Sequence, residues 1–538
     1  MKKIHILSYI LVAFLFTNCT KDLDTTPLNE SDFTSDKAYG NNEESYLSGL
    51  AKIYFNFANT QDLDVDDGGA SELVRAFWTL QEVSADACKC AWANDSWVND
   101  INNNSWSDAE NAATYAVYAR TIHAITYTNE YLKQTTDGAL KSRGCDEALI
   151  NKVHSFRAEA RFLRAYFYWM AMDIFGDVPF ITEESEFGTA NPKQAPRKEV
   201  FEFIEKELLD LAASSDMPAV RSNYPRADKG AVYGLLARLY LNAEVYTGTA
   251  KWNEAKSTCE ELFKLGYSIC SNYSWLFRGD NGENPEAKKE LIFTVAYDHL
   301  KTQSYGGTSY LSFSAISADD DFNTLMGINS GWGGNRVPYE YARDYFGVKN
   351  QNYETGEYEV TDERGKLFYI KGRQESMVEI LNFICGWSLF KYNNTPHNKN
   401  REEYATEAKT QAYSNVDYPL IRLGEIYLIY AEACLKTGNI TPALPYLNEL
   451  RTRAKVNEIN TYDEQWLLEE RARELIWEGH RRTDLIRYNK FNSASFLWKW
   501  KGGSYDGQGF ESYKNIYAIP PSEMASNLDL YQNPGYSE

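Results

Sequence analysis

The sequence predicts a mainly α-helical protein, in which a tetratricopeptide-like helical-repeat scaffold carries a large irregular region rich in aromatic residues. Several long blocks place apolar residues at three- and four-residue steps, and two of these blocks have the pattern of helix-turn-helix repeats. Between the blocks, residues 271–415 lose the helical period and carry isolated aromatics among Gly and Asn. The 39 Tyr and 13 Trp of this polar chain of 538 residues cannot all be buried.

The first expected element is a lipoprotein signal peptide over residues 1–18. Two lysines precede an apolar run at residues 4–16, which is too short to span a bilayer as a helix. Cys19 follows directly, and a thiol at this position can be acylated and anchor the mature protein in a membrane. The alternative is an ordinary secretory signal that ends near a Cys. Residues 19–45 are polar and acidic, as expected of a lipidated N-terminus and its tether.

Residues 46–270 are expected to form an N-terminal helical scaffold with a Trp-rich loop. Apolar residues recur at helical steps over residues 153–175, and Gly176 follows as a stop signal. The stretches 231–243 and 252–263 form a pair of helices with a Gly-containing turn between them. Small residues where the two helices cross are typical of tetratricopeptide pairs, which bury their apolar faces by stacking on neighbours.

Residues 416–538 are expected to form C-terminal helical repeats and a terminal segment. The stretches 423–431 and 443–450 repeat the same pairing around Thr-Gly-Asn at residues 437–439. The intervening residues 271–415 are predicted to form irregular structure that packs on this scaffold. Irregular segments of that length inside a compact protein are more often functional than idle.

Charge and cysteine content exclude some classes of function. The formal net charge is −21, and it becomes −23 once the two lysines of the signal peptide are removed, which argues against nucleic-acid partners. Beyond residue 19 no apolar stretch approaches membrane-spanning length. The seven remaining cysteines contain no CxxC pair, and Cys88 with Cys90 is a weak metal or disulfide signal, so we interpret them as scattered thiols.

The sequence gives no catalytic signature. HExxH and GxSxG motifs are absent, and a chain with 76 acidic residues contains carboxylate pairs such as Glu183 and Glu184 by composition alone. Glycoside hydrolysis needs two carboxylates at a set distance across a bond, which the sequence does not show. Inspection of the sequence does not exclude Ser/His/Asp chemistry, and it is the family resemblance given next that implies a protein that is not an enzyme. An anchored glycan hydrolase and a helical-repeat adaptor without sugar binding remain as alternatives.

Several blocks resemble the SusD (RagB/SusD) family of outer-membrane glycan-binding lipoproteins, and the match runs over nearly the whole mature chain. The blocks are Leu23-Asp24 with Pro27, RAEARFLRAYFYWMAMDIFGDVPF (157–180), RADKGAVYGLLARLYLNAEVYTG (226–248), YPLIRLGEIYLIYAEA (418–433), LNELRTRA (447–454), ERARELIWEGHRRTDLIRY (470–488) and YAIPPSEMASN (517–527) ahead of Gln532-Asn533-Pro534-Gly535-Tyr536.

The resemblance implies a lipid-anchored protein on the outer face of the outer membrane. Its scaffold would pack on a TonB-dependent transporter of the SusC type, and its irregular region would capture oligosaccharides for delivery to that transporter. The match is closest to the starch-binding founding member, through the blocks FLWKWKGG (496–503), NYSWLF (272–277) and SYGGTSYL (304–311). A neutral, starch-like α-glucan is the expected ligand, because the net charge repels acidic glycans. The same role for a fructan or a host glycan is the alternative.

In the starch-binding member an arc of aromatic side chains follows the curve of the glucan. Position by position, the resemblance puts this arc on Tyr305, Trp332 and Trp92. Cys90 stands at a further tryptophan position, so one face of the arc is missing, and Asp95 stands at the position of an asparagine. Aromatic faces pack against the C–H groups of sugar rings, while polar side chains bind the hydroxyls.

Neighbouring side chains extend the candidate glycan site. Asn94 could bind a hydroxyl, Trp97 and Tyr310 offer further rings, and Arg75 in the helix-like segment LVRAF could donate to a hydroxyl. For the aromatic residues the alternative is a role in the core or in anchoring a loop. For Arg75 the alternative is a structural salt bridge.

A calcium site is a further candidate, although no cofactor is required for sugar binding. The stretch Asp280-Asn281-Gly282-Glu283-Asn284 offers oxygen ligands in a short loop, as a hard cation requires. The starch-binding member has acidic residues here and at the position of Asp417, but Gly282 replaces one of them. The candidate ligands are therefore Asp280, Glu283 and Asp417, and the alternative is a solvated acidic turn.

Overall fold

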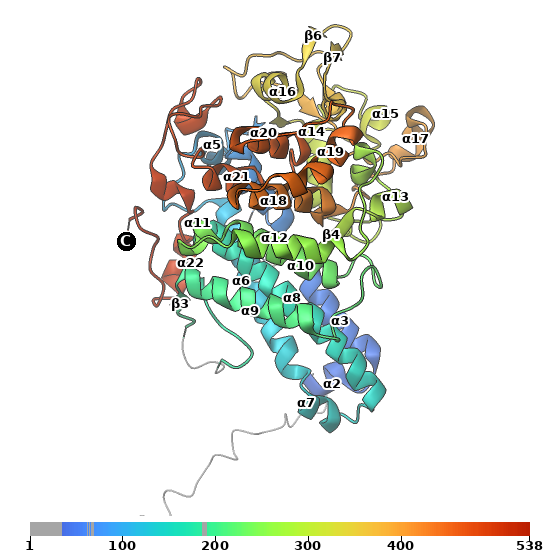
Figure 1. The fold of residues 1–538 in the computed structure, drawn as a ribbon, viewed down its shortest axis with the longest axis vertical. Coiled ribbons are helices and arrows are strands. Elements are labelled where there is room, and N and C mark those ends of the chain that lie inside the picture. Colours follow the sequence, from blue (N-terminus) through green and yellow to red (C-terminus); the bar gives the residue numbers. More distant parts are fainter. Residues whose placement is uncertain (1–34, 62, 64, 66–68, 186–190, 538) are drawn as a thin grey trace, which may run out of the picture.

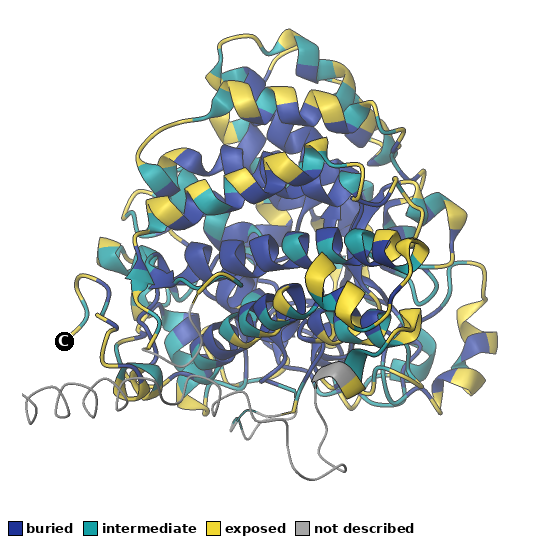
Figure 2. Cartoon of the chain, turned by 90° about the horizontal axis from the view of Figure 1, so that it is seen from below, coloured by how far each residue is buried: buried dark blue, intermediate teal, exposed yellow. Residues whose placement is uncertain are grey.

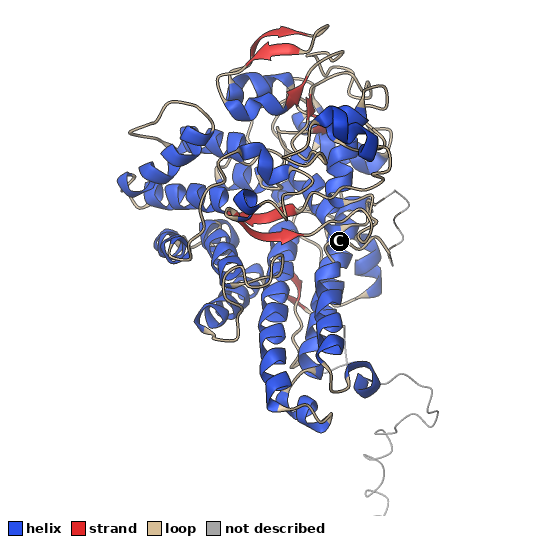
Figure 3. Ribbon diagram, turned by 90° about the vertical axis from the view of Figure 1, so that its right-hand side faces the viewer, coloured by secondary structure: helices blue, strands red, loops and turns tan. Residues whose placement is uncertain are grey.

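The computed structural model places long helices at one end of the molecule and short elements joined by loops at the other (Figures 1 and 3). It describes residues 35–61, 63, 65, 69–185 and 191–537. The predicted signal peptide and the lipidation site at Cys19 lie outside the described residues. No helix among the described residues has the length and the apolar character needed to cross a membrane.

The scaffold is a chain of helices in which each one packs on the next (Figure 1). Burial is concentrated on their inward faces, while their exposed residues lie at the outer edges (Figure 2). Stacking of this kind confirms the prediction of a mainly α, tetratricopeptide-like fold. The helices of the stack are, in order, α6 (Ala112–Gln134), α8 (Glu147–Phe175), α9 (Arg197–Ala213), α10 (Lys229–Leu241), α12 (Trp252–Phe263), α18 (Leu423–Lys436) and α20 (Glu464–Glu474).

Helix α8 begins and ends where its sequence provides caps. The side chain of Asp146 accepts a hydrogen bond from the Leu149 N–H at 2.8 Å, which satisfies a free donor of the first turn. At the other end Gly176 has φ 74°, a conformation that favours glycine, and its N–H bonds back to the Met172 carbonyl. The predicted stop at Gly176 is confirmed, while the helix starts six residues earlier than the predicted stretch.

Both helix-turn-helix pairs form where the sequence predicts them. After α10 a short helix α11 (Ala243–Thr247) ends at Gly248 with φ 74°, and α12 follows. After α18 the chain turns at Gly438, with φ 78°, into α19 (Leu444–Arg453). In both turns a glycine takes the left-handed conformation that larger residues disfavour.

The N-terminal helices begin earlier than expected. Residues 19–45 were predicted to be tether, but the described part of this range already contains helix α2 and the start of α3. The Asn42 side chain caps α3 by accepting a hydrogen bond from the Ser45 N–H, and the ring of Tyr39 stacks on Tyr46 at 5.4 Å. These contacts pack a polar stretch against the helical core. The further helices of this part are α2 (Ser35–Tyr39), α3 (Glu43–Phe55), α4 (Leu73–Trp78), α5 (Ser96–Asn103) and α7 (Asp137–Ser142).

Residues 271–415 consist of short elements joined by loops, and the longest helix among them has nine residues. Its helices are α13 (Pro285–Lys288), α14 (Gly307–Ala315), α15 (Phe322–Met326), α16 (Tyr339–Phe346) and α17 (Arg401–Ala408). Its strands are β4 (Leu291–Val295), β5 (Asn335–Arg336), β6 (Lys349–Asn352), β7 (Glu357–Glu359), β8 (Phe368–Tyr369) and β9 (Ser388–Leu389).

Two antiparallel strand pairs join this region to the rest of the chain. Strand β4 pairs with β10 (Tyr418–Arg422), which leads directly into α18 of the scaffold. Strand β1 (Lys89–Cys90) pairs with β5, so the Trp-rich loop after residue 90 lies against the loop that carries Trp332. The remaining pairs are β2 (Val178–Pro179) with β3 (Gln194–Ala195), β6 with β7, and β8 with β9.

Buried hydrogen bonds join residues 78–82 to residues 477–517, about four hundred positions later, and we call them the terminal clasp. The indole N–H of Trp78 donates to the carbonyl of Trp477 at 2.9 Å, and the N–H of Gly479 donates to Glu82 Oε1 at 2.7 Å. The hydroxyl of Tyr517 donates to the Leu80 carbonyl at 3.1 Å. The last helices are α21 (Arg481–Arg487) and α22 (Pro521–Ser526).

Buried ion pairs hold the C-terminal repeats on the short strands. Arg422 at the end of β10 contacts Glu290, Glu474 and Glu478 within 2.8 Å. Burial alone would raise the pKa of Glu474, but the guanidinium groups around it, including Arg422, hold that pKa well below its usual value. Breaking such a network leaves a buried charge without compensation, which is strongly destabilising.

Candidate functional site

The structure brings Tyr305 and Trp332 together, although 26 residues separate them in the sequence. Their ring centroids lie 5.6 Å apart in an edge arrangement, and the ring of Tyr413 lies 4.9 Å from that of Tyr305. Tyr305 is 42% exposed, so its ring is open to a ligand, and Trp332 and Tyr413 are half-buried. We call the rings of Trp92, Tyr305, Trp332 and Tyr413 the aromatic platform.

Trp332 is held from below by Phe313 of α14. The two rings stack at 4.8 Å with an interplanar angle of 23°, and the Trp332 N–H donates to the Phe313 carbonyl at 2.9 Å. The next residue, Gly333, lies against the ring of Phe383, which is 37% exposed. A large, half-buried ring whose position is fixed by stacking is suited to pack on a sugar.

Trp92 lies against the next glycine of the same turn. A methyl group at Gly334 would lie 2.6 Å from the Trp92 ring, so this flat contact requires glycine. The ring of Trp92 also lies 6.0 Å from that of Tyr310. The next residues, Asn94 and Asp95, are exposed, and the Asp95 N–H donates to the Trp92 carbonyl at 3.0 Å. Their side-chain oxygens are therefore placed at the surface beside a ring, where sugar hydroxyls can be bound.

Two residues predicted to contact the glycan lie beneath the platform instead. Tyr310 and Arg75 are each only 2% exposed, and the Arg75 guanidinium lies 4.3 Å from the Tyr310 ring centroid. The Tyr310 hydroxyl donates to Asn335 Oδ1 at 3.2 Å, inside the protein. The prediction that they contact sugar is therefore corrected: their helical neighbours bury them, and they support the ring of Trp92 from within.

Trp97 and Cys90 also make contacts within the protein. Trp97 in α5 is partly buried against the core, and its carbonyl accepts from the Asn111 side chain at 3.2 Å. Cys90 is 2% exposed in strand β1, and the Asn102 side chain bonds both its N–H and its carbonyl. The position of Cys90 therefore adds no ring to the platform. All seven described cysteines are buried and form no disulfide with one another.

A buried carboxyl group lies below the turn that carries Tyr305. Glu72 is fully buried and accepts hydrogen bonds from the hydroxyls of Tyr297 and Ser304. Burial raises the pKa of Glu72 to about 7, although these two hydrogen bonds and the charges of Arg75 and Arg120 act in the opposite direction.

The three predicted calcium ligands do not form one coordination site. Both oxygens of Asp280 bond His397, and both oxygens of Asp417 accept hydrogen bonds, from the Tyr224 hydroxyl at 2.8 Å and the Tyr297 N–H at 3.0 Å. Glu283 is exposed to solvent. Within the described ranges, no group of three or more His, Cys, Asp or Glu side chains could hold a metal ion. Calcium binding at this acidic loop stays a prediction.

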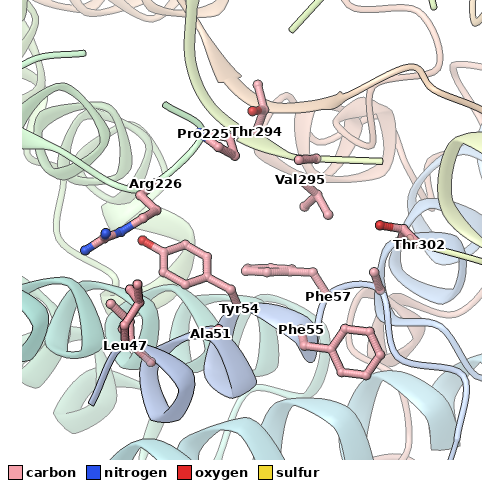
Figure 4. Close-up of a pocket in the computed structure, with 13 residues that line it drawn as sticks. Leu47, Ala51, Tyr54, Phe55, Phe57, Pro225, Arg226, Thr294, Val295 and Thr302 are labelled. Carbon is pink, nitrogen blue, oxygen red and sulfur yellow. The ribbon is translucent and has the colours of Figure 1, made fainter. Parts of the chain in front are cut away.

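A hollow of about 280 Å³ lies between α3 and β4, close to the loop that leads to Tyr305 (Figure 4). Its lining is almost entirely apolar and includes Tyr54, Phe55, Phe57 and Val295. The Tyr54 hydroxyl already donates to Glu159 at 2.8 Å, which leaves few polar groups for sugar hydroxyls. The chemistry of this hollow differs from that of the platform, so we do not include it in the glycan site.

The platform consists of aromatic side chains, which are suited to packing against sugar rings. The Glu478-Gly479-His480 stretch, which could suggest acid–base chemistry, lies in the turn between α20 and α21. There the N–H groups of Gly479 and His480 donate to Glu82 Oε1, and Glu478 forms ion pairs with Lys391 and Arg422. These side chains are used to hold the fold together.

Fold and site thus define a helical-repeat binding protein, and comparison with known proteins gives its family. The SusD family matches residues 289–536, and a SusD-like family described as "Starch-binding associating with outer membrane" matches residues 65–241. The Starch-binding protein SusD of Bacteroides thetaiotaomicron is 31% identical over 99% of this chain and 98% of its own length. The SusD-like protein P2 of Formosa agariphila is 23% identical over 75% of this chain and 78% of its own length. The chain belongs to the SusD family.

Solved structures show the same fold. A SusD superfamily protein of Parabacteroides distasonis superposes with a TM-score of 0.69 at 21% identity, covering 94% of this chain and all of that one. A laminarin-binding SusD-like protein superposes with a TM-score of 0.64 at 21% identity, covering 93% of this chain and all of that one. The SusD family is non-catalytic, so the chain is not an enzyme, as the sequence predicts.

The sequence did not identify Tyr413 or Phe383 as part of the site. Both stand in loops of the irregular region and come next to Tyr305 and Trp332 only through the fold. The signal that pointed to Tyr305, an aromatic residue among Ser, Asn and Gly, is also present at Tyr413 in the stretch QAYSN. It could have marked Tyr413 in the same way.

Proposed function

We propose that this protein is a cell-surface glycan-binding lipoprotein, which captures oligosaccharides on the aromatic platform and delivers them to a TonB-dependent outer-membrane transporter of the SusC type. The observation that carries the proposal is the convergence of Tyr305, Trp332 and Tyr413 on one exposed surface, with Trp92 beside it. Full-length similarity to a starch-binding relative supports it. The membrane anchor would be the lipidated Cys19.

The ligand we propose is a neutral glycan, with an α-glucan as the first choice. Tyr305 and Trp332, two of the aromatic positions that the starch-binding resemblance implies, lie with their ring centroids 5.6 Å apart, and Tyr413 adds a ring beside Tyr305. Trp92, a third such position, packs on Gly334, two residues after Trp332. A chain with a formal charge of −21 disfavours acidic polymers. The buried Cys90 means that the arc has one ring fewer, so a fructan or a host glycan remains the alternative.

Retardation in native gels tests glycan binding. The protein from residue 20 onward is run in gels that contain amylopectin, levan, inulin, dextran or mucin glycans. Trp332→Ala removes one face of the platform, and Trp252→Ala is the matched control, because Trp252 is a half-buried tryptophan of the scaffold helix α12. We expect retardation by amylopectin that only Trp332→Ala abolishes. Retardation by another polymer alone would change the ligand, and no retardation by any polymer would contradict glycan binding by the free protein.

A second experiment tests the partner and the anchor. The protein is extracted from membranes with a mild detergent, and the extract is fractionated by size. We expect it to elute together with a large β-barrel, and Cys19→Ala to appear in the soluble fraction. Elution as a single chain in every preparation would contradict delivery to a transporter.

A further inference from the structure

We infer that helix α14 (Gly307–Ala315) organises the aromatic platform, and that the buried Glu72 is the positioning residue that fixes this helix. The inference rests on the proposed function, because it assigns to Glu72 a role in glycan affinity. Its structural part concerns the order of residues 304–313 and can be tested without any glycan.

Helix α14 contacts two of the platform rings and is joined to a third by the chain. Tyr305 comes directly before Gly306, the residue that precedes the helix. Within the helix, Tyr310 lies 6.0 Å from Trp92, and Phe313 stacks at 4.8 Å under Trp332. A helix of nine residues moves as one body, so a shift of its N-terminus changes the spacing of all three rings.

Glu72 ties the N-terminus of α14 to helix α4. Its Oε1 accepts from the Tyr297 hydroxyl, and its Oε2 accepts from the Ser304 hydroxyl. The oxygen of Ser304 in turn accepts from the Gly306 N–H at 2.9 Å. One carboxylate therefore fixes both ends of the loop 297–304 and, through Ser304, the first residue before the helix.

The glycines of the block SYGGTSYL allow this contact. A methyl group at Gly306 would collide with the Glu72 carboxylate, and a methyl group at Gly307 would collide with the Tyr297 hydroxyl. On the opposite side, a methyl group at Gly69 would lie 2.5 Å from the backbone of Tyr305. The turn is thus packed directly on the segment that precedes α4, with no side chain between them.

Helix α4 holds α14 at a second point. Arg75, one turn after Glu72, places its guanidinium 4.3 Å from the Tyr310 ring centroid. Arg75 and Arg120 are the cations that act on Glu72, and Tyr297 and Ser304 are its hydrogen-bond donors. A buried carboxylate with these neighbours keeps its hydrogen bonds only in one position of the loop, which is why we assign it a positioning role.

Hydrogen exchange measured by mass spectrometry tests the structural part. At pH 8, above the pKa of about 7 of Glu72, Glu72→Ala should speed exchange in peptides that cover residues 304–313 by about tenfold, because a charge-assisted pair of hydrogen bonds is lost. Asp173→Ala is the matched control: Asp173 is also buried and accepts from a tyrosine and a threonine hydroxyl, of Tyr246 at 2.7 Å and Thr483 at 3.0 Å, but in scaffold helix α8. We expect it to leave exchange at 304–313 unchanged.

If Glu72→Ala does not fold, Glu72→Gln tests the same contact by the same exchange measurement. The amide retains one acceptor oxygen, so exchange at residues 304–313 should rise by only about threefold. Unchanged exchange in both Glu72 variants, or an equal increase in Asp173→Ala, would overturn the inference.

Affinity for the polysaccharide that retards the wild-type protein is the second readout. Glu72→Ala should weaken it by about tenfold and Glu72→Gln by about threefold or less, while Asp173→Ala leaves it within about twofold. Wild-type affinity in Glu72→Ala would overturn the assignment to the platform. If the wild-type protein binds no polysaccharide, the proposed function fails, and hydrogen exchange still decides whether Glu72 positions α14.

Discussion

Glutamine at position 82 should flatten the pH dependence of stability between pH 5 and pH 8. Glu82 is fully buried, and its Oε1 accepts from the N–H groups of Gly479 and His480 at 2.7 and 3.0 Å. Its Oε2 has no hydrogen-bond partner among the described residues. Burial raises the pKa of Glu82 from 4.5 to about 7, while these backbone donors and the charge of Arg481 act in the opposite direction.

The sign of the effect follows from that direction. A carboxyl group whose pKa is raised on folding stabilises the native state fully below pH 4.5, and this contribution is lost as the pH rises through about 7. A shift from 4.5 to about 7 at about 1.4 kcal/mol per unit gives a loss of roughly 3 kcal/mol between pH 4.5 and pH 8. The amide of Glu82→Gln keeps the acceptor oxygen and does not titrate, so the variant avoids this loss.

Urea unfolding followed by tryptophan fluorescence provides the assay. Free energies of unfolding are measured at pH 5, 6, 7 and 8 and constant ionic strength for the wild type, Glu82→Gln and the control Asp417→Asn. The free energy of unfolding of Glu82→Gln relative to wild type should rise by roughly 2.5 kcal/mol from pH 5 to pH 8, because part of the loss in the wild type already lies below pH 5. Burial raises the pKa of Asp417 to about 6, so the control should show its change about one pH unit lower. Parallel curves for Glu82→Gln and wild type would refute the reasoning.

Three further predictions concern the platform and the acidic loop. Tyr413→Ala should weaken polysaccharide binding by about threefold to tenfold in gel retardation and leave the melting temperature within about 2 °C, because a half-buried ring is removed from the surface; wild-type retardation would exclude Tyr413 from the site. Gly334→Ala should lower both affinity and thermal stability, because φ is 110° and the methyl group meets the Trp92 ring; an unchanged melting curve would contradict the observed packing. EDTA should leave the melting temperature within about 1 °C, because Asp280 and Asp417 already have hydrogen-bond partners. A melting temperature that rises when calcium is added would instead support a calcium site at this loop.

The helical scaffold could be predicted because its signals are local. The period of apolar residues in 153–175 and the stop at Gly176 are read within one turn or two of helix, and the structure confirms them. The turn at Gly438 is equally local, because a left-handed glycine ends the helix there. The start of α8 and the helices α2 and α3 were harder to predict from the sequence. Their first turns are polar and carry little apolar periodicity, and they depend on capping residues such as Asn42 and Asp146.

The candidate site was only partly predictable, because a short stretch of sequence does not determine how deeply each of its side chains is buried. Tyr305 and Tyr310 stand five residues apart in the same block, yet one is 42% exposed and the other 2%. Tyr310 is part of helix α14, which turns its ring inward, against Arg75 and Trp92. Sequence resemblance pointed to these segments, and the direction of each side chain required the three-dimensional arrangement.

The terminal clasp has a consequence for how the protein becomes functional during its biogenesis. Trp78 and Glu82 lie close in sequence to Arg75 and Trp92 of the candidate site. Their hydrogen-bond partners, Trp477 and Gly479, come about four hundred residues later. Contacts of such long sequence separation form late, because the intervening chain must be closed first. A chain emerging N-terminus first therefore cannot assemble a competent sugar surface until nearly its whole length has been released. A truncated product lacking the last seventy residues should be unable to bind, even with every platform ring present.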